Sequence, residues 1–218
     1  MDGQVANGRK VLMILRQFLH TDPVAISYLF GCGGHATYAV VDPIGDIESY
    51  LRVADETGMQ IRFVTDTHIH ADHRSAGRAL ASEAGAEYVL LVTDRTRADE
   101  PWFILTGHTL MVGDVGRTEL ATDAPAAART LFASLERLKT LPDYIEVLPG
   151  AYAGSVCGRR LSGKPSSTIG FERRHNSAFR IGAADEFVAF MLQDIPPAPP
   201  EAAELRAWNS GLPGVAAQ

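Results

Sequence analysis

At residues 67–73 the chain reads Thr67-His68-Ile69-His70-Ala71-Asp72-His73, which places three imidazoles and one carboxylate close together. The residues just before it, 62–65, are rich in β-branched and aromatic side chains and predict a strand, whereas residues 74–83 have the composition of a helix. In extended backbone, side chains two residues apart point the same way, so His68 and His70 can face one point together. Asp72 and His73 then turn in from the start of the helix, where the helix dipole favours a carboxylate.

This set of side chains predicts a metal site. Neutral imidazole and carboxylate suit zinc, iron or manganese better than calcium, which prefers more oxygen ligands. One histidine alone is more often a surface or hydrogen-bonded core residue, and Asp72 alone would pass as a helix cap. Four such residues at this spacing rarely arise as caps, so we interpret residues 67–73 as a metal-binding loop between a strand and a helix.

Length and composition indicate an ordinary globular protein of 218 residues, 46% of them hydrophobic and 21% charged. The formal net charge of -6 gives no general attraction to phosphate backbones, so we expect no nucleic-acid partner. The apolar run at residues 11–15 ends at Arg16 and is too short to cross a bilayer or to form a signal-peptide core. We expect a cytoplasmic protein without a membrane partner, with a flexible tail at residues 1–9 and one domain at residues 10–218. A homodimer is left open.

The chain has two cysteines, Cys32 and Cys157, which are too few for a disulfide framework and suit a reducing compartment. Cys157 lies among glycines and arginines, a setting that can lower the pKa of a thiol. A single cysteine is more often inert packing, and both interpretations of Cys157 stay open at this point.

The order of the predicted elements indicates an α/β layered fold with a mixed sheet. Three apolar runs separated by turn signals predict an antiparallel meander at residues 10–18, 25–30 and 36–41. A helix at residues 46–57, closed by Gly58, and a strand at residues 61–65 follow. Further strands are predicted at residues 87–93, 102–105 and 144–148, and further helices begin at residues 122–125, 184 and 201. Strands in a row, followed by strands that alternate with helices, favour this layered class.

Three further features are candidates for the site. His108 follows the strand at residues 102–105 and reaches the same edge of the sheet as the histidine loop if the two strands run parallel; a loop histidine bonded to backbone is an equally good interpretation. Arg117, in a turn with two glycines, offers a rigid fork for a carboxylate, although a solvated arginine explains it more simply. Residues 154–172 show no periodicity and predict a long loop, whose Arg159 and Lys164 either hold an anionic substrate or form a solubilising surface.

With these segments in place, the chain resembles the metallo-β-lactamase superfamily over nearly all of residues 10–210, and within it most resembles the persulfide dioxygenase branch and its glyoxalase II-like relatives. The most specific segments are residues 67–73, 106–120 and 154–173. The resemblance implies an αββα sandwich of mixed sheets with outer helices. It also implies one metal position at His68 and His70 and a second at Asp72 and His73, with His108 as a further ligand. In the dioxygenase branch a single iron is held by the residue equivalent to His68, a later histidine and an aspartate.

The chain departs from the family pattern in three places. A Gly-His-Thr-Pro segment that carries a ligand histidine is missing between Tyr88 and Val92, as though a few tens of residues were deleted, so the fold is expected to be incomplete between residues 88 and 92. His108 stands where the pattern has an aspartate, and Ala151 stands where it has a histidine.

The sequence leaves three functions open. The leading one is a metalloenzyme, most like an iron-dependent persulfide dioxygenase, that oxidises a glutathione-linked sulfur substrate held by Arg117, Arg159 and Lys164. The second is a zinc-dependent, glyoxalase II-like thioester hydrolase in which Asp72 positions the attacking water. The third is a non-catalytic fold relic or partner-binding module, because a ligand segment is missing. The implied cofactor is Fe(2+) or Zn(2+), and the implied partner is a small thiol or thioester.

Overall fold

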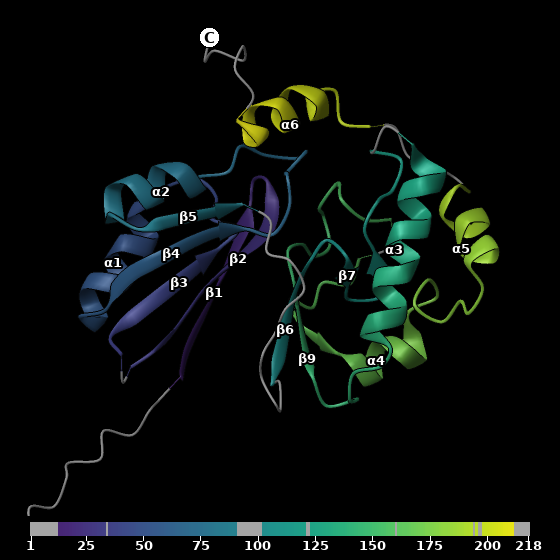
Figure 1. The fold of residues 1–218 in the computed structure, drawn as a ribbon, viewed down its shortest axis with the longest axis horizontal. Coiled ribbons are helices and arrows are strands. Elements are labelled where there is room, and N and C mark those ends of the chain that lie inside the picture. The colour runs from purple at the N-terminus through teal and green to yellow at the C-terminus, as the bar shows by residue number, and fades with distance from the viewer. Residues whose placement is uncertain are drawn as a thin grey trace, which may run out of the picture.

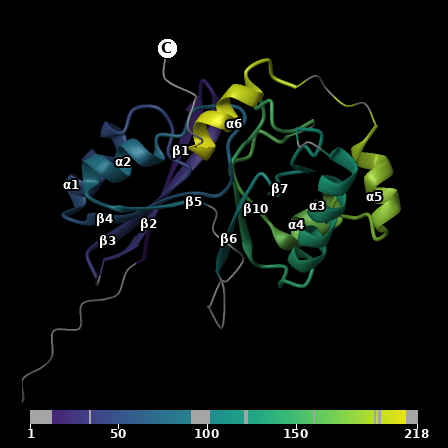
Figure 2. The same ribbon diagram turned by 45° about the horizontal axis from the view of Figure 1, so that its top comes forward.

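The computed structural model describes residues 13–33, 35–90, 102–120, 123–159, 161–193, 195 and 198–211. Two sheets pack against each other, and helices cover the outer side of each sheet (Figures 1 and 2). This is the αββα sandwich with mixed sheets that the resemblance predicted. The tail predicted at residues 1–9 lies outside the described residues. The deletion predicted between residues 88 and 92 lies partly outside them. Both stay predictions.

The first sheet contains the predicted meander and the strand that precedes the histidine loop. Its strands lie in the order β1 (Met13–Thr21), β2 (Val24–Cys32), β3 (Thr37–Val41), β4 (Gln60–Asp66) and β5 (Glu87–Leu90). The first three strands pair antiparallel, whereas β3, β4 and β5 run parallel. Helices α1 (Glu48–Thr57) and α2 (Gly77–Ala84) connect the parallel strands, and each ends at a glycine in the left-handed conformation, Gly58 and Gly85.

The second sheet has the order β10 (Ser167–Thr168), β9 (Glu146–Pro149) and β6 (Phe103–Gly107), with β6 and β9 parallel. Its outer face is covered by α3 (Ala124–Leu138), α4 (Ile169–His175) and α5 (Ala184–Met191). The short strands β7 (Leu110–Met111) and β8 (Asp114–Val115) form a separate hairpin. The expectation that β6 would share a sheet with β4 is therefore wrong, because β6 pairs with β9 instead.

The buried apolar side chains form three clusters that match the layers. One lies between α1, α2 and the first sheet and includes Tyr50 and Leu80. A second lies between the two sheets and includes Tyr28 and Leu148. The third packs the second sheet against its helices and includes Phe187. Because each sheet buries both of its faces, the edge where the strands end is left for loops that carry polar side chains.

The prediction of one irregular loop over residues 154–172 is wrong at its end. Ser167 and Thr168 form β10, and α4 begins at Ile169 with the Thr168 hydroxyl accepting a hydrogen bond from the Phe171 amide at 3.2 Å. A helix of this length spans about two turns, which is too short for its apolar spacing to stand out in the sequence.

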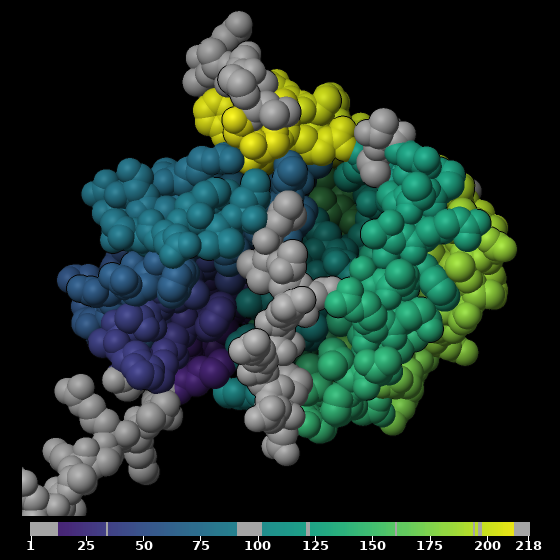
Figure 3. Space-filling model, viewed as in Figure 1, coloured from purple at the N-terminus to yellow at the C-terminus, as the bar shows by residue number. Residues whose placement is uncertain are grey.

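Helix α6 (Ala202–Ser210) lies across the top of the molecule, beside the loop that follows β4 (Figures 1 and 3). Its Asn209 side chain donates to the carbonyl oxygens of His70 and His73 at 2.9 and 2.8 Å and accepts from the Ser75 amide at 2.9 Å. The last helix is thereby attached directly to the histidine loop.

Within the described part of the chain, none of the helices has the length and apolar character that a bilayer span requires.

Candidate metal centre

The imidazoles predicted as ligands gather where β4 and β6 end. The ring centroids of His68 and His70 lie 4.2 Å apart, and those of His70 and His73 lie 4.1 Å apart. His108, from the end of β6, brings its ring to 4.4 Å from that of His68. His108 therefore reaches the histidine loop because the two sheets pack against each other, and not because β4 and β6 pair within one sheet. These four histidines and Asp72 form one cluster.

Several buried polar atoms of this cluster have no hydrogen-bond partner among the described residues. They are His68 Nε2, both ring nitrogens of His70 and His73, and Asp72 Oδ1. A buried polar atom without a partner costs about 1–3 kcal/mol, so several such atoms at one point need a physical explanation. A metal ion bound among them would take a lone pair from Asp72 Oδ1 and from one nitrogen of each ring.

Two aspartates, Asp42 and Asp66, complete the surroundings of His70, and the sequence reasoning missed both. Asp42 Oδ1 lies 3.3 Å from His70 Nε2, and Asp66 Oδ1 lies 3.6 Å from the same nitrogen. Each follows or ends a central strand, β3 or β4. That position at the strand ends was the signal available in the sequence.

The carboxylates control the protonation of His70. Burial lowers the pKa of this imidazole, but Asp42 and Asp66 outweigh burial and raise its pKa to about 10. Burial alone would raise the pKa of Asp42, whereas the contact with His70 and the hydrogen bond from the Thr67 amide hold it well below its usual range. In the metal-free chain His70 is thus a cation between carboxylates, and a metal ion bound by His70 must displace its proton.

His68 and His108 are uncharged, in contrast to His70. Burial, and secondarily the neighbouring imidazoles, lower the pKa of His68 well below its ordinary value. Burial likewise lowers the pKa of His108, against the opposing effect of Asp72. Both rings are therefore neutral at pH 7, and each has a nitrogen lone pair available to a metal ion.

Asp72 faces a second group of ligand atoms. Its Oδ1 lies 3.0 Å from His73 Nδ1, outside hydrogen-bond geometry, and its Oδ2 accepts a hydrogen bond from the Cys157 thiol at 3.0 Å. Burial raises the pKa of Asp72, but the adjacent His73 and His108 outweigh burial and keep it below its usual range. A carboxylate kept ionised in a buried site suits a metal ligand or a proton acceptor.

Together, the described residues hold three groups whose ligand atoms lie within 4.8 Å of one another. These are Asp42, His68 and His70; His70, Asp72 and His73; and Asp72, His108 and Cys157. Imidazole nitrogen, carboxylate oxygen and sulfur together suit zinc or iron better than magnesium or calcium. The residues present fit a zinc or iron centre. Ala151 stands where the family pattern has a histidine. Its side chain is buried and has no atom that could bind a metal ion.

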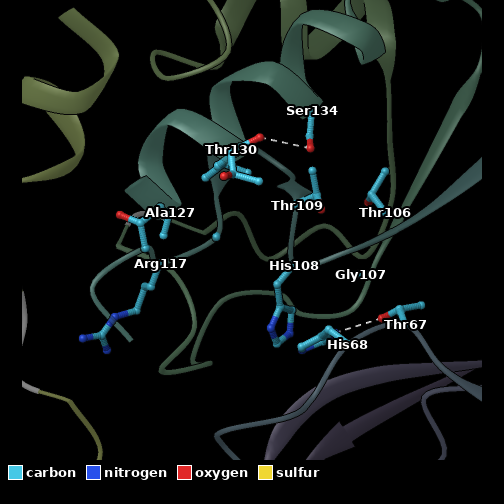
Figure 4. Close-up of a pocket in the computed structure, with 13 residues that line it drawn as sticks. Thr67, His68, Thr106, Gly107, His108, Thr109, Arg117, Ala127, Thr130 and Ser134 are labelled. Carbon is cyan, nitrogen blue, oxygen red and sulfur yellow. Dashed lines mark hydrogen bonds between the residues drawn. The ribbon is translucent and has the colours of Figure 1, made fainter. Parts of the chain in front are cut away.

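A cavity of about 410 Å³ opens beside the cluster, with His68 and His108 in its wall (Figure 4). The opposite wall comes from α3, which contributes Ala127, Thr130, Leu131 and Ser134. The hydroxyl of Thr118, also in the wall, is buried and unpaired within the described residues. The cavity therefore combines imidazoles of the candidate metal centre with a mixed apolar and hydroxyl surface, which is typical of a small-molecule site.

The residues predicted to hold the substrate lie in different surroundings. The Arg117 side chain lines the cavity, but its guanidinium bonds to Glu119 and, at 3.0 Å, to the Val156 carbonyl oxygen, and it points away from the histidines in Figure 4. Arg159 donates to the carbonyl oxygens of Phe190 and Met191 at the end of α5. Lys164 is exposed. Substrate binding by these three residues stays a prediction.

Comparison with known proteins agrees with this architecture. The chain superposes on a metallo-β-lactamase from Staphylococcus aureus subsp. aureus COL with a TM-score of 0.84 and 29% identity, covering 90% of this chain and 72% of that one. It superposes on ETHE1 from Myxococcus xanthus with a TM-score of 0.76 and 25% identity, covering 90% and 98% of the two chains. TTHA1623, solved in a di-iron-bound form, shares the fold at 22% identity and a TM-score of 0.57, over 74% of this chain and 98% of that one.

In sequence alone, a stretch of 61 residues is 41% identical to hydroxyacylglutathione hydrolase from Anaeromyxobacter dehalogenans (strain 2CP-C). The match spans 28% of this chain and 23% of that protein. No family model matches the chain. The layers, the convergent histidines and these likenesses show that the chain has the metallo-β-lactamase fold, with candidate ligands for a divalent metal at the position where β4 and β6 end.

Proposed function

We propose that the protein is a metal-dependent enzyme that acts on a small sulfur-containing substrate, and that the reaction is the oxidation of a glutathione-linked persulfide. The observation that carries this proposal is the set of unpaired, buried imidazole nitrogens beside a cavity of about 410 Å³. The overall likeness supports it further, because the chain superposes over 98% of the chain of ETHE1, a persulfide dioxygenase.

His68, His108 and Asp72 would hold the metal on the side of the centre that faces the cavity. Two imidazoles and one carboxylate leave coordination positions open, and iron in such a site supplies the redox chemistry that activates oxygen. His68 and His108 are neutral and half-buried, so they would donate lone pairs without first losing a proton. Asp72 brings a negative charge that partly balances the charge of the cation.

The cavity wall would orient the substrate. The Thr118 hydroxyl offers a hydrogen bond that no described residue takes, and the apolar surface of Ala127 and Leu131 excludes water from the sulfur atom. His70, enclosed by Asp42 and Asp66, would be a further ligand of the centre beside His68. These groups hold a reactive sulfur against the metal-facing wall while the rest of the substrate extends along α3.

A second candidate function is thioester hydrolysis, which the 41% identity with hydroxyacylglutathione hydrolase favours. In that reaction the Asp72 carboxylate, kept ionised by His73 and His108, would orient the attacking water and accept its proton. Zinc bound here would polarise the thioester carbonyl.

Metal analysis combined with two assays separates the functions. The purified chain is loaded with Fe(2+) without oxygen or with Zn(2+), freed of excess metal, and assayed for oxygen uptake with glutathione persulfide and for cleavage of a glutathione thioester. We expect stoichiometric iron and persulfide-dependent oxygen uptake. Thioester cleavage with zinc and no oxygen uptake would instead establish the hydrolase.

The control is the double variant His68→Ala/His70→Ala, in which metal uptake should be abolished, beside His35→Ala, which changes an exposed imidazole and should bind metal normally. Unchanged uptake by the double variant would mean that these histidines are not the ligands. Absence of stoichiometric zinc, iron and manganese from the unmodified chain would exclude both reactions and favour the non-catalytic relic or partner-binding module.

A further inference from the structure

Asp66 is held by two side chains for which the proposed function has no use. Its Oδ2 accepts a hydrogen bond from the Ser75 hydroxyl and another from the Tyr88 hydroxyl, both at 2.6 Å. Tyr88 lies in β5, which pairs with β4, and Ser75 lies in the turn before α2. Because Asp66 is 1% exposed, little solvent competes with these two donors. The two hydrogen bonds therefore restrict the rotation of the Asp66 carboxylate.

The other oxygen of Asp66 faces His70. This Oδ1 is buried, has no hydrogen-bond partner in the described part of the chain and lies 3.6 Å from His70 Nε2. Asp42 Oδ1 lies 3.3 Å from the same nitrogen. The other ring nitrogen, Nδ1, lies 3.9 Å from Asp72 Oδ1. The His70 ring thus has a pair of carboxylates at Nε2 and a candidate metal ligand beside Nδ1.

The packing around Tyr88 allows its hydroxyl to reach Asp66. A Cβ atom at Gly77 would lie only 2.6 Å from Tyr88 Cε2, so a larger residue at position 77 would displace the ring. On the ring face, the Arg78 guanidinium lies 5.2 Å from the ring centroid and donates to the Asn209 carbonyl oxygen at 2.9 Å. Burial and the nearby Asp66 raise the pKa of Tyr88, so its hydroxyl keeps the proton that it donates.

We propose that Tyr88 and Ser75 are positioning residues of the metal centre. Through Asp66 they hold the His70 ring with its Nε2 proton against the carboxylates and its Nδ1 lone pair toward the metal. A carboxylate that accepts the remaining N–H of a ligand histidine fixes the orientation of the ring and makes it a stronger ligand. The inference rests on the proposed function only in requiring that the chain binds metal.

Cobalt binding tests this role. The full chain is titrated with Co(2+), competition with a chelator of known affinity gives the Kd, and the visible absorption of the bound ion reports its coordination geometry. The variant Tyr88→Phe keeps the ring and removes only the hydroxyl. We expect it to bind cobalt about 10–100-fold more weakly and to change the absorption per bound ion. A loss of stability alone would lower the amount of folded chain but not change that absorption.

The matched control is Tyr152→Phe, which removes a hydroxyl that donates to the His20 carbonyl oxygen at 2.9 Å. Its Kd and absorption should equal those of the unmodified chain. A double-variant comparison shows whether Tyr88 acts through Asp66: Asp66→Ala/Tyr88→Phe should bind cobalt no more weakly than Asp66→Ala. Additive losses would refute that route, and an unchanged Kd and absorption in Tyr88→Phe would refute the positioning role.

The results distinguish this inference from the proposed function. An unaffected Tyr88→Phe overturns the inference and leaves the enzyme proposal intact. The expected effects without persulfide or thioester turnover support the inference and overturn the enzyme proposal, and no cobalt binding at all overturns both. If a variant does not fold, nitrogen NMR of His70 in the unmodified zinc-loaded chain decides. A proton on Nε2 with zinc on Nδ1 supports the inference, and the reverse refutes it.

Discussion

Burial distinguishes the imidazoles of the candidate metal centre from ordinary surface histidines. His68 and His108 are neutral because the protein interior disfavours their charge, whereas His70 is charged because Asp42 and Asp66 lie beside it. One cluster therefore holds histidines in opposite protonation states at the same pH. The different states follow from the neighbours of each ring and not from the residue type.

Gly116 shows how tightly the backbone packs around His108. A Cβ atom at position 116 would overlap the His108 carbonyl oxygen, which is rigid backbone and has little room to move. We expect Gly116→Ala to destabilise the chain by about 1–3 kcal/mol, the usual cost of overpacking. Chemical denaturation measures this difference in the free energy of unfolding.

Gly163→Ala is the matched control, because a Cβ atom there would meet no heavy atom within 4 Å. The control should unfold at the same denaturant concentration as the unmodified chain. If Gly116→Ala is as stable as Gly163→Ala, the backbone at residues 108 and 116 has more room for a Cβ atom than the structure shows.

At the scale of elements, the histidine loop is attached to a helix far away in sequence. Asn209 of α6 bonds to the carbonyl oxygens of His70 and His73 and to the Ser75 amide, and it is 2% exposed. A loop with free carbonyl groups would otherwise have to keep water at this point. Helix α6 thus acts as a support that holds the backbone of the histidine loop in place.

Replacing Asn209 by alanine should test this support. The change leaves two buried carbonyl oxygens and one amide unpaired, so we expect a loss of about 1–3 kcal/mol in stability. We also expect metal affinity to fall about 10–100-fold, as is usual when a residue that positions ligands is removed. Denaturation and competition with a chelator of known affinity measure the two effects.

The comparison variant is Arg74→Ala, which removes the contact of Arg74 with Glu204 at 3.1 Å between α6 and the same loop. Those side chains are 49% and 58% exposed, so their ion pair contributes little, and both stability and metal affinity should change only slightly. Should Asn209→Ala retain full metal affinity, α6 would be packing and not a support for the centre.

At the scale of the whole molecule, the centre is assembled from two sheets that pack face to face. His68, His70 and Asp72 follow β4 of the first sheet, whereas His108 follows β6 of the second sheet, and Cys157 lies in the loop after β9. A metal ion bound here therefore joins the two halves of the sandwich. Binding should stabilise the whole fold and not one loop.

We expect zinc to raise the Tm of the unmodified chain, with a stabilisation of about 2.7 kcal/mol when free zinc exceeds the Kd a hundredfold. A chelator should reverse the shift. Calorimetry with and without zinc measures it, and the double variant His68→Ala/His70→Ala should show a much smaller shift. A Tm unaffected by zinc in the unmodified chain would favour the non-catalytic alternative.

Local patterns in the sequence were sufficient for most of the elements. Alternation and turn residues predicted the meander of β1, β2 and β3, and glycine at positions 58 and 85 terminates α1 and α2 as helix-ending chemistry requires. The spacing of His68, His70, Asp72 and His73 predicted a common point for their side chains. Each of these inferences depends on residues within a few positions of one another.

Only the tertiary structure decided how distant residues meet. It placed β6 in a second sheet, brought Asp42 and Asp66 to His70, and put the sulfur of Cys157 against Asp72. Periodicity along a chain reports which face of an element is buried but not which other element covers that face. The sequence by itself thus determined the histidine loop and its strand, whereas the packing of two sheets decided which other side chains join the candidate centre, because that choice depends on contacts between segments far apart in the chain.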